Sequence, residues 1–371
     1  MDPRLRGGHD TKERMHRSAG TKRGRATFAA TMLDPQIRHV DDSKPGITRR
    51  KAGRGWGYYK PDGGRITDRD EIDRLNKIAL PPAYKNAWYC LRPDGHIQAT
   101  GVDDRGRKQY RYHLDFRAAQ EALKYEKCAD FGRALPKLRA RVEEDLARRS
   151  LGRDTVVAAV VRLLDLGHIR VGNEAYTKEN KSFGATTLRN RHAKVTGARL
   201  RLEYVGKSGK KQRLTIEDSR LARIARRTQD LPGQHLFEYL DAEGAPHPVD
   251  SSDVNTYIKD ATGGDFTAKH FRTWGASLLA FEHIMEAGKG GKLSLKPMLE
   301  GVAAALGNTP AISRKSYVHP SLIDLCRTGD ATGICALKLP RSTRWLTPHE
   351  RALIAFLDEL AALAEEESKA A

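Results

Sequence analysis

Cysteine is scarce in this chain, and its four cysteines show neither C-x-x-C pairing nor the spacing of a zinc site. They are Cys90, Cys128, Cys326 and Cys335. Isolated thiols of this kind are typical of reduced, partly buried residues in a cytosolic protein. The sequence thus offers no ligand cluster for a metal, and we expect a chemistry that uses no metal or other cofactor.

Long apolar runs are also missing. No segment approaches the roughly 20 apolar residues that cross a bilayer, and the charged N-terminus lacks the apolar stretch of a secretory signal. These two absences argue against a membrane protein and a secreted one, and they favour a cytoplasmic location.

Acidic residues are outnumbered by basic ones. The chain has 47 Asp and Glu against 66 Lys and Arg, which gives a formal net charge of +19. Such an excess attracts polyanions. We therefore expect nucleic acid as the partner, and an anionic membrane surface is the weaker alternative because no apolar run is long enough to cross a bilayer.

The residue composition and the pattern of apolar residues change twice along the sequence. Its 371 residues are enough for two domains. Residues 1–40 are rich in Arg, Gly and Lys and predict a disordered basic arm. Residues 41–117 hold short apolar runs separated by P-D-G turns, which predict a small antiparallel β domain. Residues 121–371 predict a mostly helical domain, so the expected fold class is α+β.

Past Asp115 the sequence becomes helical, and we expect helices over 116–125, 135–146 and 156–164. Asp154 or Thr155 can cap the third helix, and Gly167 can end it.

Two further elements have clear local signatures. Alternating apolar residues over 200–216 flank a Gly-containing turn and predict a β-hairpin. Thr347 and Glu350 form a capping-box pattern that opens a last amphipathic helix.

A tyrosine near the C-terminus stands in a chemically suggestive segment. Thr309 can cap a short helix, Pro310 suits its first turn, and Arg314 and Lys315 precede Tyr317. A phenol with a pKa near about 10 needs cations nearby if it is to attack at neutral pH. The simpler interpretation is a half-buried helix tyrosine beside solvated basic residues.

Three more basic residues occupy positions suited to an anion. Arg272 lies beside the predicted apolar face of a helix near its N-terminus, Arg170 falls in a tight turn between helices, and Lys207 sits at the tip of the hairpin. Each of them taken alone is more often structural.

Taken together, the segments resemble one family. I-R-V-G-N-E-A-Y (169–176), Y-V-G-K (204–207), K-H-F-R-T-W-G (269–275) and N-T-P-A-I-S-R-K-S-Y-V (308–318) occur in this order. They resemble the catalytic domain of type IB DNA topoisomerases of the poxvirus and bacterial kind, and residues 101–112 resemble a DNA-contacting strand of that family. The resemblance runs from about residue 45 to about residue 365.

The resemblance implies a role for each matching residue. Tyr317 would be the nucleophile that retains a 3′-phosphate, Arg170 and Arg272 would hold the non-bridging oxygens, and Lys207 would protonate the departing 5′-oxygen. It further implies a monomer that closes around supercoiled double-stranded DNA as a C-shaped clamp. Neither ATP nor metal is implied.

Asn308 departs from the commonest family pattern, in which histidine stands nine residues before the nucleophile. An amide can still donate one hydrogen bond to a phosphoryl oxygen, but it brings no charge and does not titrate near pH 6.5. We expect a weaker contact at this position. His270 and His319 lie nearby in sequence and are interpreted as structural.

The same resemblance suggests DNA contacts away from the reacting phosphate. They involve Gln109, Tyr110 and Tyr112 on one predicted strand, and Tyr176 of the catalytic domain. Alternation along the strand places Gln109 on one face and the two tyrosines on the other.

Two other functions remain open on the sequence. A tyrosine recombinase shares the order Arg, Lys, Arg, Tyr, but its segment usually reads H-x-L-R-H where this chain has K-H-F-R-T-W-G. A non-enzymatic basic DNA-binding protein would satisfy the charge, but it gives no reason for the ordered motifs.

Overall fold

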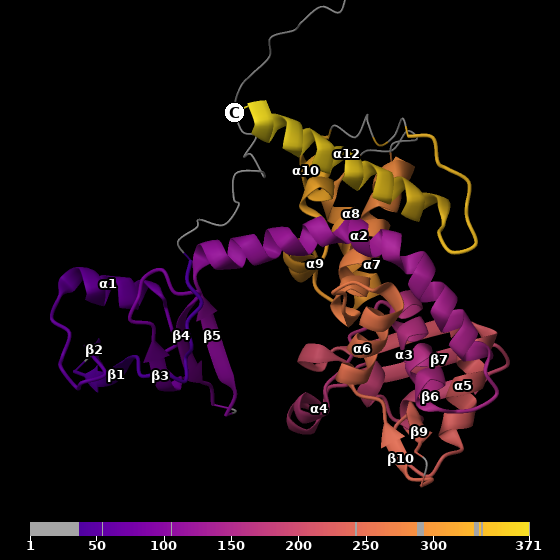
Figure 1. Cartoon of the computed structure of the whole chain (residues 1–371), viewed down its shortest axis with the longest axis horizontal. Helices are drawn as coiled ribbons and strands as arrows, with labels where there is room; N and C mark the ends of the chain where they lie inside the picture. The colour runs from indigo at the N-terminus through magenta and orange to yellow at the C-terminus, as the bar shows by residue number, and fades with distance from the viewer. Residues whose placement is uncertain are drawn as a thin grey trace, which may run out of the picture.

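The computed structural model describes residues 37–53, 55–104, 106–241, 243–287, 293–329, 334 and 337–370. Figure 1 shows a small β domain joined by one long helix to a larger, mostly helical body, so the predicted α+β class is confirmed. Most of the predicted basic arm, residues 1–36, lies outside the described residues.

The β domain is a five-stranded antiparallel sheet in the order β2-β1-β3-β4-β5. Its strands are β1 Ile47–Ala52, β2 Gly55–Tyr59, β3 Lys85–Tyr89, β4 Ile97–Val102 and β5 Lys108–Tyr112. Helix α1, Arg69–Lys77, contributes Leu75 to a core with Ile47, Tyr58 and Tyr89. Before the first strand, Arg38 exchanges backbone hydrogen bonds with Asp94 and His96, both at 2.8 Å.

Helix α2, Leu114–Ala147, runs from the β domain into the helical body as one 34-residue element. The sequence predicts two helices here, so this prediction was wrong about the interruption. Pro136 lies inside the helix and cannot donate to the carbonyl four residues earlier. Figure 1 shows that α2 bends along its course, which accommodates the proline without ending the helix.

The helical body packs around α3, Arg153–Gly167, of whose 15 residues 11 are buried, most of them in one core cluster. Its cap differs from the prediction: Gly152 is the N-cap, with no side-chain hydrogen bond, and the left-handed residue that ends the helix is His168, with φ 48°. The other helices are α4 Glu174–Asn180, α5 Ser219–Gln229, α6 Ser251–Thr262, α7 Ala268–Ala287, α8 Leu295–Leu306, α9 Pro310–Ser316, α10 Pro320–Thr328 and α12 Pro348–Ala370.

The predicted hairpin is confirmed as β7, Arg199–Val205, and β8, Lys211–Glu217, with β6, Ala193–Thr196, as a third strand. Leu200, Leu202 and Tyr204 are buried while the residues between them are exposed, which is the alternation of a half-buried strand. The described residues of the body also contain the short strand pair β9, Glu238–Leu240, and β10, Pro246–Pro248, together with three 3₁₀ turns.

A buried ion-pair network ties three helices together. Arg139 of α2 binds Asp165 of α3 at 2.8 Å and Glu350 of α12 at 2.7 Å. Glu350 also closes the predicted capping box, accepting from the Thr347 backbone N–H at 2.8 Å while its own N–H donates to the Thr347 hydroxyl. Burial disfavours the charge of Arg139, but the two carboxylates outweigh it and raise the pKa of the guanidinium.

Replacing Arg139 with Met is expected to lower the free energy of unfolding by about 3–5 kcal/mol, because two buried carboxylates lose their partner. The matched control is Arg133→Met, which removes an exposed pair with Asp130 and Asp358 and should cost about 0–1 kcal/mol. Urea unfolding followed by circular dichroism measures both. Equal losses in the two variants would contradict the role of the network.

Candidate active site

Tyr317 lies at the end of the short helix α9, as the sequence predicts. The Thr309 hydroxyl accepts from the Ile312 N–H at 3.3 Å, Pro310 occupies the first helical position, and Tyr317 is the C-cap residue. Pro320 starts the next helix, α10. The phenol therefore projects from a fixed junction between two helices.

Arg272 of α7 is the most enclosed cation of the site, at 3% exposure. Its guanidinium donates to the backbone carbonyls of His168 and of Leu306, the latter at 3.1 Å, and lies 4.7 Å from the centre of the Tyr317 ring. His168 caps the C-terminus of α3 and Leu306 is the last residue of α8. Both carbonyls belong to helix ends, where a cation is favoured.

Arg170 and Asn308 form the next contact. A terminal nitrogen of Arg170 donates to the side-chain oxygen of Asn308 at 2.6 Å, across 138 residues of sequence. Asn308 is 7% exposed, and its amide nitrogen has no hydrogen-bond partner among the described residues. A buried donor without a partner is costly, so it is a candidate contact for a substrate oxygen.

Lys207 opens the 3₁₀ turn η4, Lys207–Gly209, at the tip of the β7–β8 hairpin. The side chains of Lys207, Arg170, Arg272 and Tyr317 line one cavity of about 310 Å³, together with Tyr176 from α4. Four of the five predicted catalytic residues thus share one cavity, and Asn308 joins them through Arg170.

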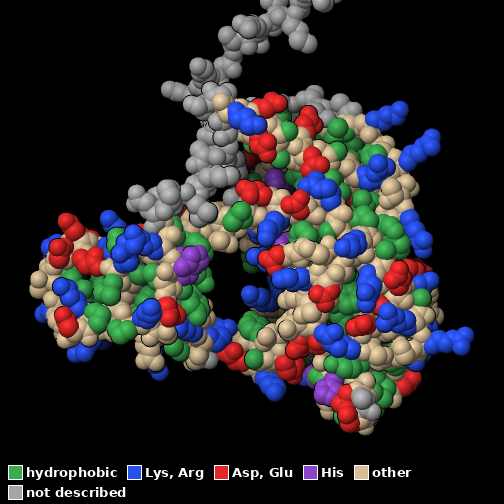
Figure 2. Space-filling view, in the orientation of Figure 1, with side chains coloured by type: hydrophobic (Ala, Val, Ile, Leu, Met, Phe, Trp, Pro, Cys, Tyr) green, Lys and Arg blue, Asp and Glu red, His purple; other side chains and the backbone are tan. Residues whose placement is uncertain are grey.

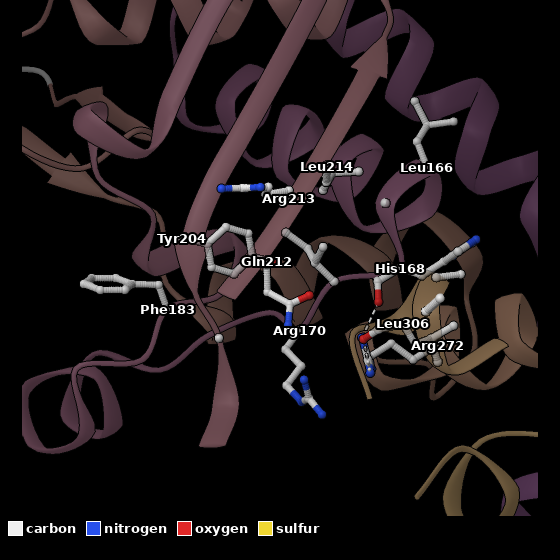
Figure 3. Close-up of a pocket in the computed structure, with 15 residues that line it drawn as sticks. Leu166, His168, Arg170, Phe183, Tyr204, Gln212, Arg213, Leu214, Arg272 and Leu306 are labelled. Carbon is white, nitrogen blue, oxygen red and sulfur yellow. Dashed lines mark hydrogen bonds between the residues drawn. The ribbon is translucent and has the colours of Figure 1, made fainter. Parts of the chain in front are cut away.

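A second cavity, of about 300 Å³, lies against the first and also uses Arg170 and Arg272. Figure 3 shows Gln212 reaching from the hairpin toward Arg170, while Arg272 lies beside His168 and Leu306. The two arginines therefore stand in the wall between the two cavities.

The surroundings of Tyr317 favour its phenolate. Burial raises the pKa of the phenol, but the charges of Arg272, Arg170 and Lys207 outweigh burial and hold the pKa below its usual value. Cations near an acid stabilise its charged form. The site can therefore supply a nucleophilic oxygen without a histidine base.

The neighbouring histidines are shifted toward the neutral form. Burial lowers the pKa of His319 to about 4 and also lowers those of His168 and His270. No histidine is among the described residues that line the 310 Å³ cavity shared by Tyr317, Arg170, Arg272 and Lys207.

The predicted DNA-contact residues divide into two groups. Tyr176 lies in the catalytic cavity. Tyr110 and Tyr112 stack at 5.9 Å on β5 and are 41% and 45% exposed. Gln109 donates to Asp103 at 2.9 Å, so its amide already has a partner within the β domain. Tyr112 also lines a cavity of about 580 Å³ that reaches Tyr317.

Two lysines beside the nucleophile were missed by sequence reasoning. Lys124 of α2 donates to the Ser316 carbonyl, and its ammonium lies 5.8 Å from the centre of the Tyr317 ring. Burial, aided by the charge of Lys269, lowers the pKa of Lys124 to about 8. Lys269 lies three residues before Arg272, a helical spacing that signals a shared face, whereas Lys124 has no comparable local signal.

Comparison with known proteins agrees with this geometry. Residues 113–324 match the family described as eukaryotic DNA topoisomerase I, catalytic core. The chain belongs to the type IB DNA topoisomerase family. Residues 55–103 of the β domain match the family described as bacterial DNA topoisomerase IB, N-terminal domain.

Viral type IB topoisomerases are among the relatives. The DNA topoisomerase 1B of Acanthamoeba polyphaga mimivirus is 32% identical over 292 residues, which cover 76% of this chain and 87% of the relative. The DNA topoisomerase I of Monkeypox virus is 22% identical over 62% of this chain and 72% of the relative.

Family membership decides among the functions left open by the sequence. The chain is a DNA topoisomerase that acts on DNA, and the recombinase and non-enzymatic alternatives are not supported. Among the described residues, no helix is both long and apolar enough to cross a bilayer.

Replacing Lys124 with Met is expected to slow DNA cleavage by about 10-fold, because Ser316 loses a charged donor worth about 1.5–3 kcal/mol and Tyr317 loses its fixed position. Single-turnover cleavage at saturating enzyme measures the rate. The control is Lys127→Met on the same helix, whose ammonium lies 3.9 Å from Asp265. A Lys124 variant that binds DNA more weakly but cleaves bound DNA at the normal rate would contradict this role.

Proposed function

We propose that this topoisomerase relaxes supercoiled duplex DNA by cutting one strand through a covalent 3′-phosphotyrosine at Tyr317, letting the duplex swivel, and resealing it. The observation that carries the proposal is the placing of three cations, Arg272, Arg170 and Lys207, around a phenol whose pKa they lower. This is the arrangement that a tyrosine nucleophile requires.

In the proposed reaction Tyr317 first loses its proton to water, the phenolate oxygen attacks the phosphorus, and the bond from phosphorus to the 5′-oxygen breaks. Arg170 and Arg272 stabilise the charge that develops on the non-bridging oxygens, since guanidinium groups match phosphate geometry and stay charged. Well-aimed donors are typically worth about 3–4 kcal/mol each in such a transition state. Lys207 gives a proton to the departing 5′-oxygen, and the unpaired amide of Asn308 donates to a phosphoryl oxygen.

Resealing is the reverse of the same step. The free 5′-hydroxyl attacks the phosphotyrosine, returns its proton to Lys207 and releases the phenolate. One phosphodiester is replaced by another ester of similar energy, so the reaction needs no ATP. The described residues hold no group of three or more His, Cys, Asp or Glu side chains placed to bind a metal. In this proposal Arg170 and Arg272 stabilise the charge that develops on the non-bridging oxygens.

We infer that the two lobes form the clamp. Figure 2 shows an opening between the β domain and the helical body, with Lys and Arg side chains at its rim. Across it, Arg107 of the β domain lies 3.8 Å from Glu179 of α4. An exposed pair of this kind is worth about 0–1 kcal/mol, so it would open readily to admit a duplex.

Within this clamp Tyr110, Tyr112, Tyr176 and Gln109 are proposed DNA contacts, and a single chain supplies every residue of the reaction. A monomer that encircles duplex DNA in the nucleoid accounts for the positive charge of the chain.

The direct test is plasmid relaxation in EDTA without ATP. The unaltered protein is expected to relax supercoiled plasmid through a ladder of intermediates. Tyr317→Phe should lose relaxation completely and keep DNA affinity within about 3-fold, because only the attacking oxygen is removed. Denaturant trapping should leave labelled DNA covalently bound to Tyr317 in the unaltered protein alone. Relaxation by Tyr317→Phe would refute the assignment.

Replacing Asn308 with His is expected to add a pH-dependent decline to the profile of cleavage rate against pH. An imidazolium donates a charge-assisted hydrogen bond, so the rate should be highest below the pKa of the new histidine and fall as pH rises through it. The adjacent Arg170 should hold that pKa below about 6.5. The unaltered protein and Asn308→Ala should lack this decline in single-turnover cleavage between pH 5 and 7.5. Parallel profiles for all three proteins would contradict the contact.

A further inference from the structure

We propose that Lys210 is a positioning residue for the proton donor Lys207, because it fastens the hairpin that carries Lys207 to the turn in front of helix α9. The inference rests on the proposed role of Lys207 and adds a second lysine with a different task.

The anchoring contact joins residues far apart in the sequence. The Lys210 ammonium donates to the backbone carbonyl of Asn308 at 2.6 Å, in a partly buried environment and across 98 residues. A hydrogen bond from a charged donor is roughly twice as strong as a neutral one. This bond links the hairpin to the segment that leads directly into the helix of Tyr317.

The turn between Lys207 and Lys210 is internally fixed. The Gly206 N–H donates to the Lys210 carbonyl at 2.7 Å, and the Gly209 N–H donates to the Gly206 carbonyl at 3.2 Å. Ser208 and Gly209 both have left-handed backbone, with φ 63° and 74°. Because the turn is closed by its own hydrogen bonds, holding Lys210 in place also holds Lys207.

Gln212 makes a second contact between the same two segments. A Cβ atom added to Gly307 would lie 2.0 Å from the side-chain oxygen of Gln212, and one added to Gly206 would lie 3.0 Å from its Cγ. The glutamine side chain therefore fills the space between the hairpin and the turn before α9. Figure 3 shows it extending from β8 toward Arg170.

Lys207 needs such an anchor because its own side chain is exposed. It lines the cavity of Tyr317, whereas Lys210 is not among the described residues that line that cavity. Lys210 instead binds the carbonyl of Asn308, whose side chain binds Arg170 at 2.6 Å. The proton donor and one phosphate-binding arginine are thereby held against the same residue.

The first test compares Lys210→Met with Lys211→Met, its neighbour on the hairpin, in single-turnover cleavage of duplex DNA. A donor displaced by about 1 Å can lose about 10²-fold in rate. We expect Lys210→Met to cleave about 10–100-fold more slowly with DNA affinity within about 3-fold, Lys211→Met to stay within about 2-fold, and Lys210→Arg to recover part of the loss. A rate for Lys210→Met equal to that of Lys211→Met would overturn the inference.

The second test asks whether Lys210 acts through Lys207. The same duplex is made with sulfur in place of the bridging 5′-oxygen at the cleavage site. A thiol has a pKa of about 8.5, far below that of an alcohol, so the sulfur leaves as a thiolate and needs no proton. Lys207→Met and Lys210→Met should then both approach the unaltered rate, while Arg272→Ala should remain slow.

The outcomes separate the two claims. If Lys207→Met regains its rate on the sulfur substrate and Lys210→Met does not, Lys210 acts elsewhere and the inference fails while the proposed function stands. If neither variant regains its rate, Lys207 is not the proton donor, and its proposed role fails together with the inference.

Discussion

The catalytic body depends on one buried charge, the guanidinium of Arg272. A cation at 3% exposure must be paired or hydrogen-bonded if the fold is to tolerate it. Here the partners are the carbonyls of His168 and Leu306, which end two different helices. Burial still lowers the pKa of this arginine, so the protein holds a charge that it only partly compensates. A bound phosphate would complete the compensation.

This arrangement explains why the site is assembled from distant segments. His168 precedes Arg170 by two residues, and Leu306 precedes Asn308 by two. Fixing Arg272 to both carbonyls therefore also fixes Arg170 and Asn308, the other two groups proposed to contact the phosphate. Gly275 permits the approach, since a Cβ atom there would lie 2.5 Å from the His168 ring. The left-handed backbone of His168, which is uncommon for a residue with a side chain, is part of the same geometry.

The sequence predicts those elements whose formation depends on neighbouring residues. The hairpin follows from alternation, and the short helix of Tyr317 and the Thr347 capping box follow from capping residues, so all three are confirmed. The sequence predicts two helices separated by residues 126–134 where the structure has the single helix α2. This helix packs against α3, α6, α7 and α12, and such long-range packing leaves no local signal in the sequence. The Lys124 and Lys210 contacts span 192 and 98 residues, and no local pattern encodes them.

The electrostatic design favours charges that do not titrate near neutrality. Asn308 stands where a histidine is common, and the buried histidines around the site are shifted toward the neutral form, His319 to a pKa of about 4. Arginines supply fixed positive charge, while in the proposed reaction the groups whose protons move are the phenol of Tyr317 and the ammonium of Lys207. Because a neutral amide gives up the stronger contact of an imidazolium, the remaining donors must be placed accurately. An anchor such as Lys210, which restricts the flexible donor Lys207, therefore matters more in a site that lacks the charge of a histidine at position 308.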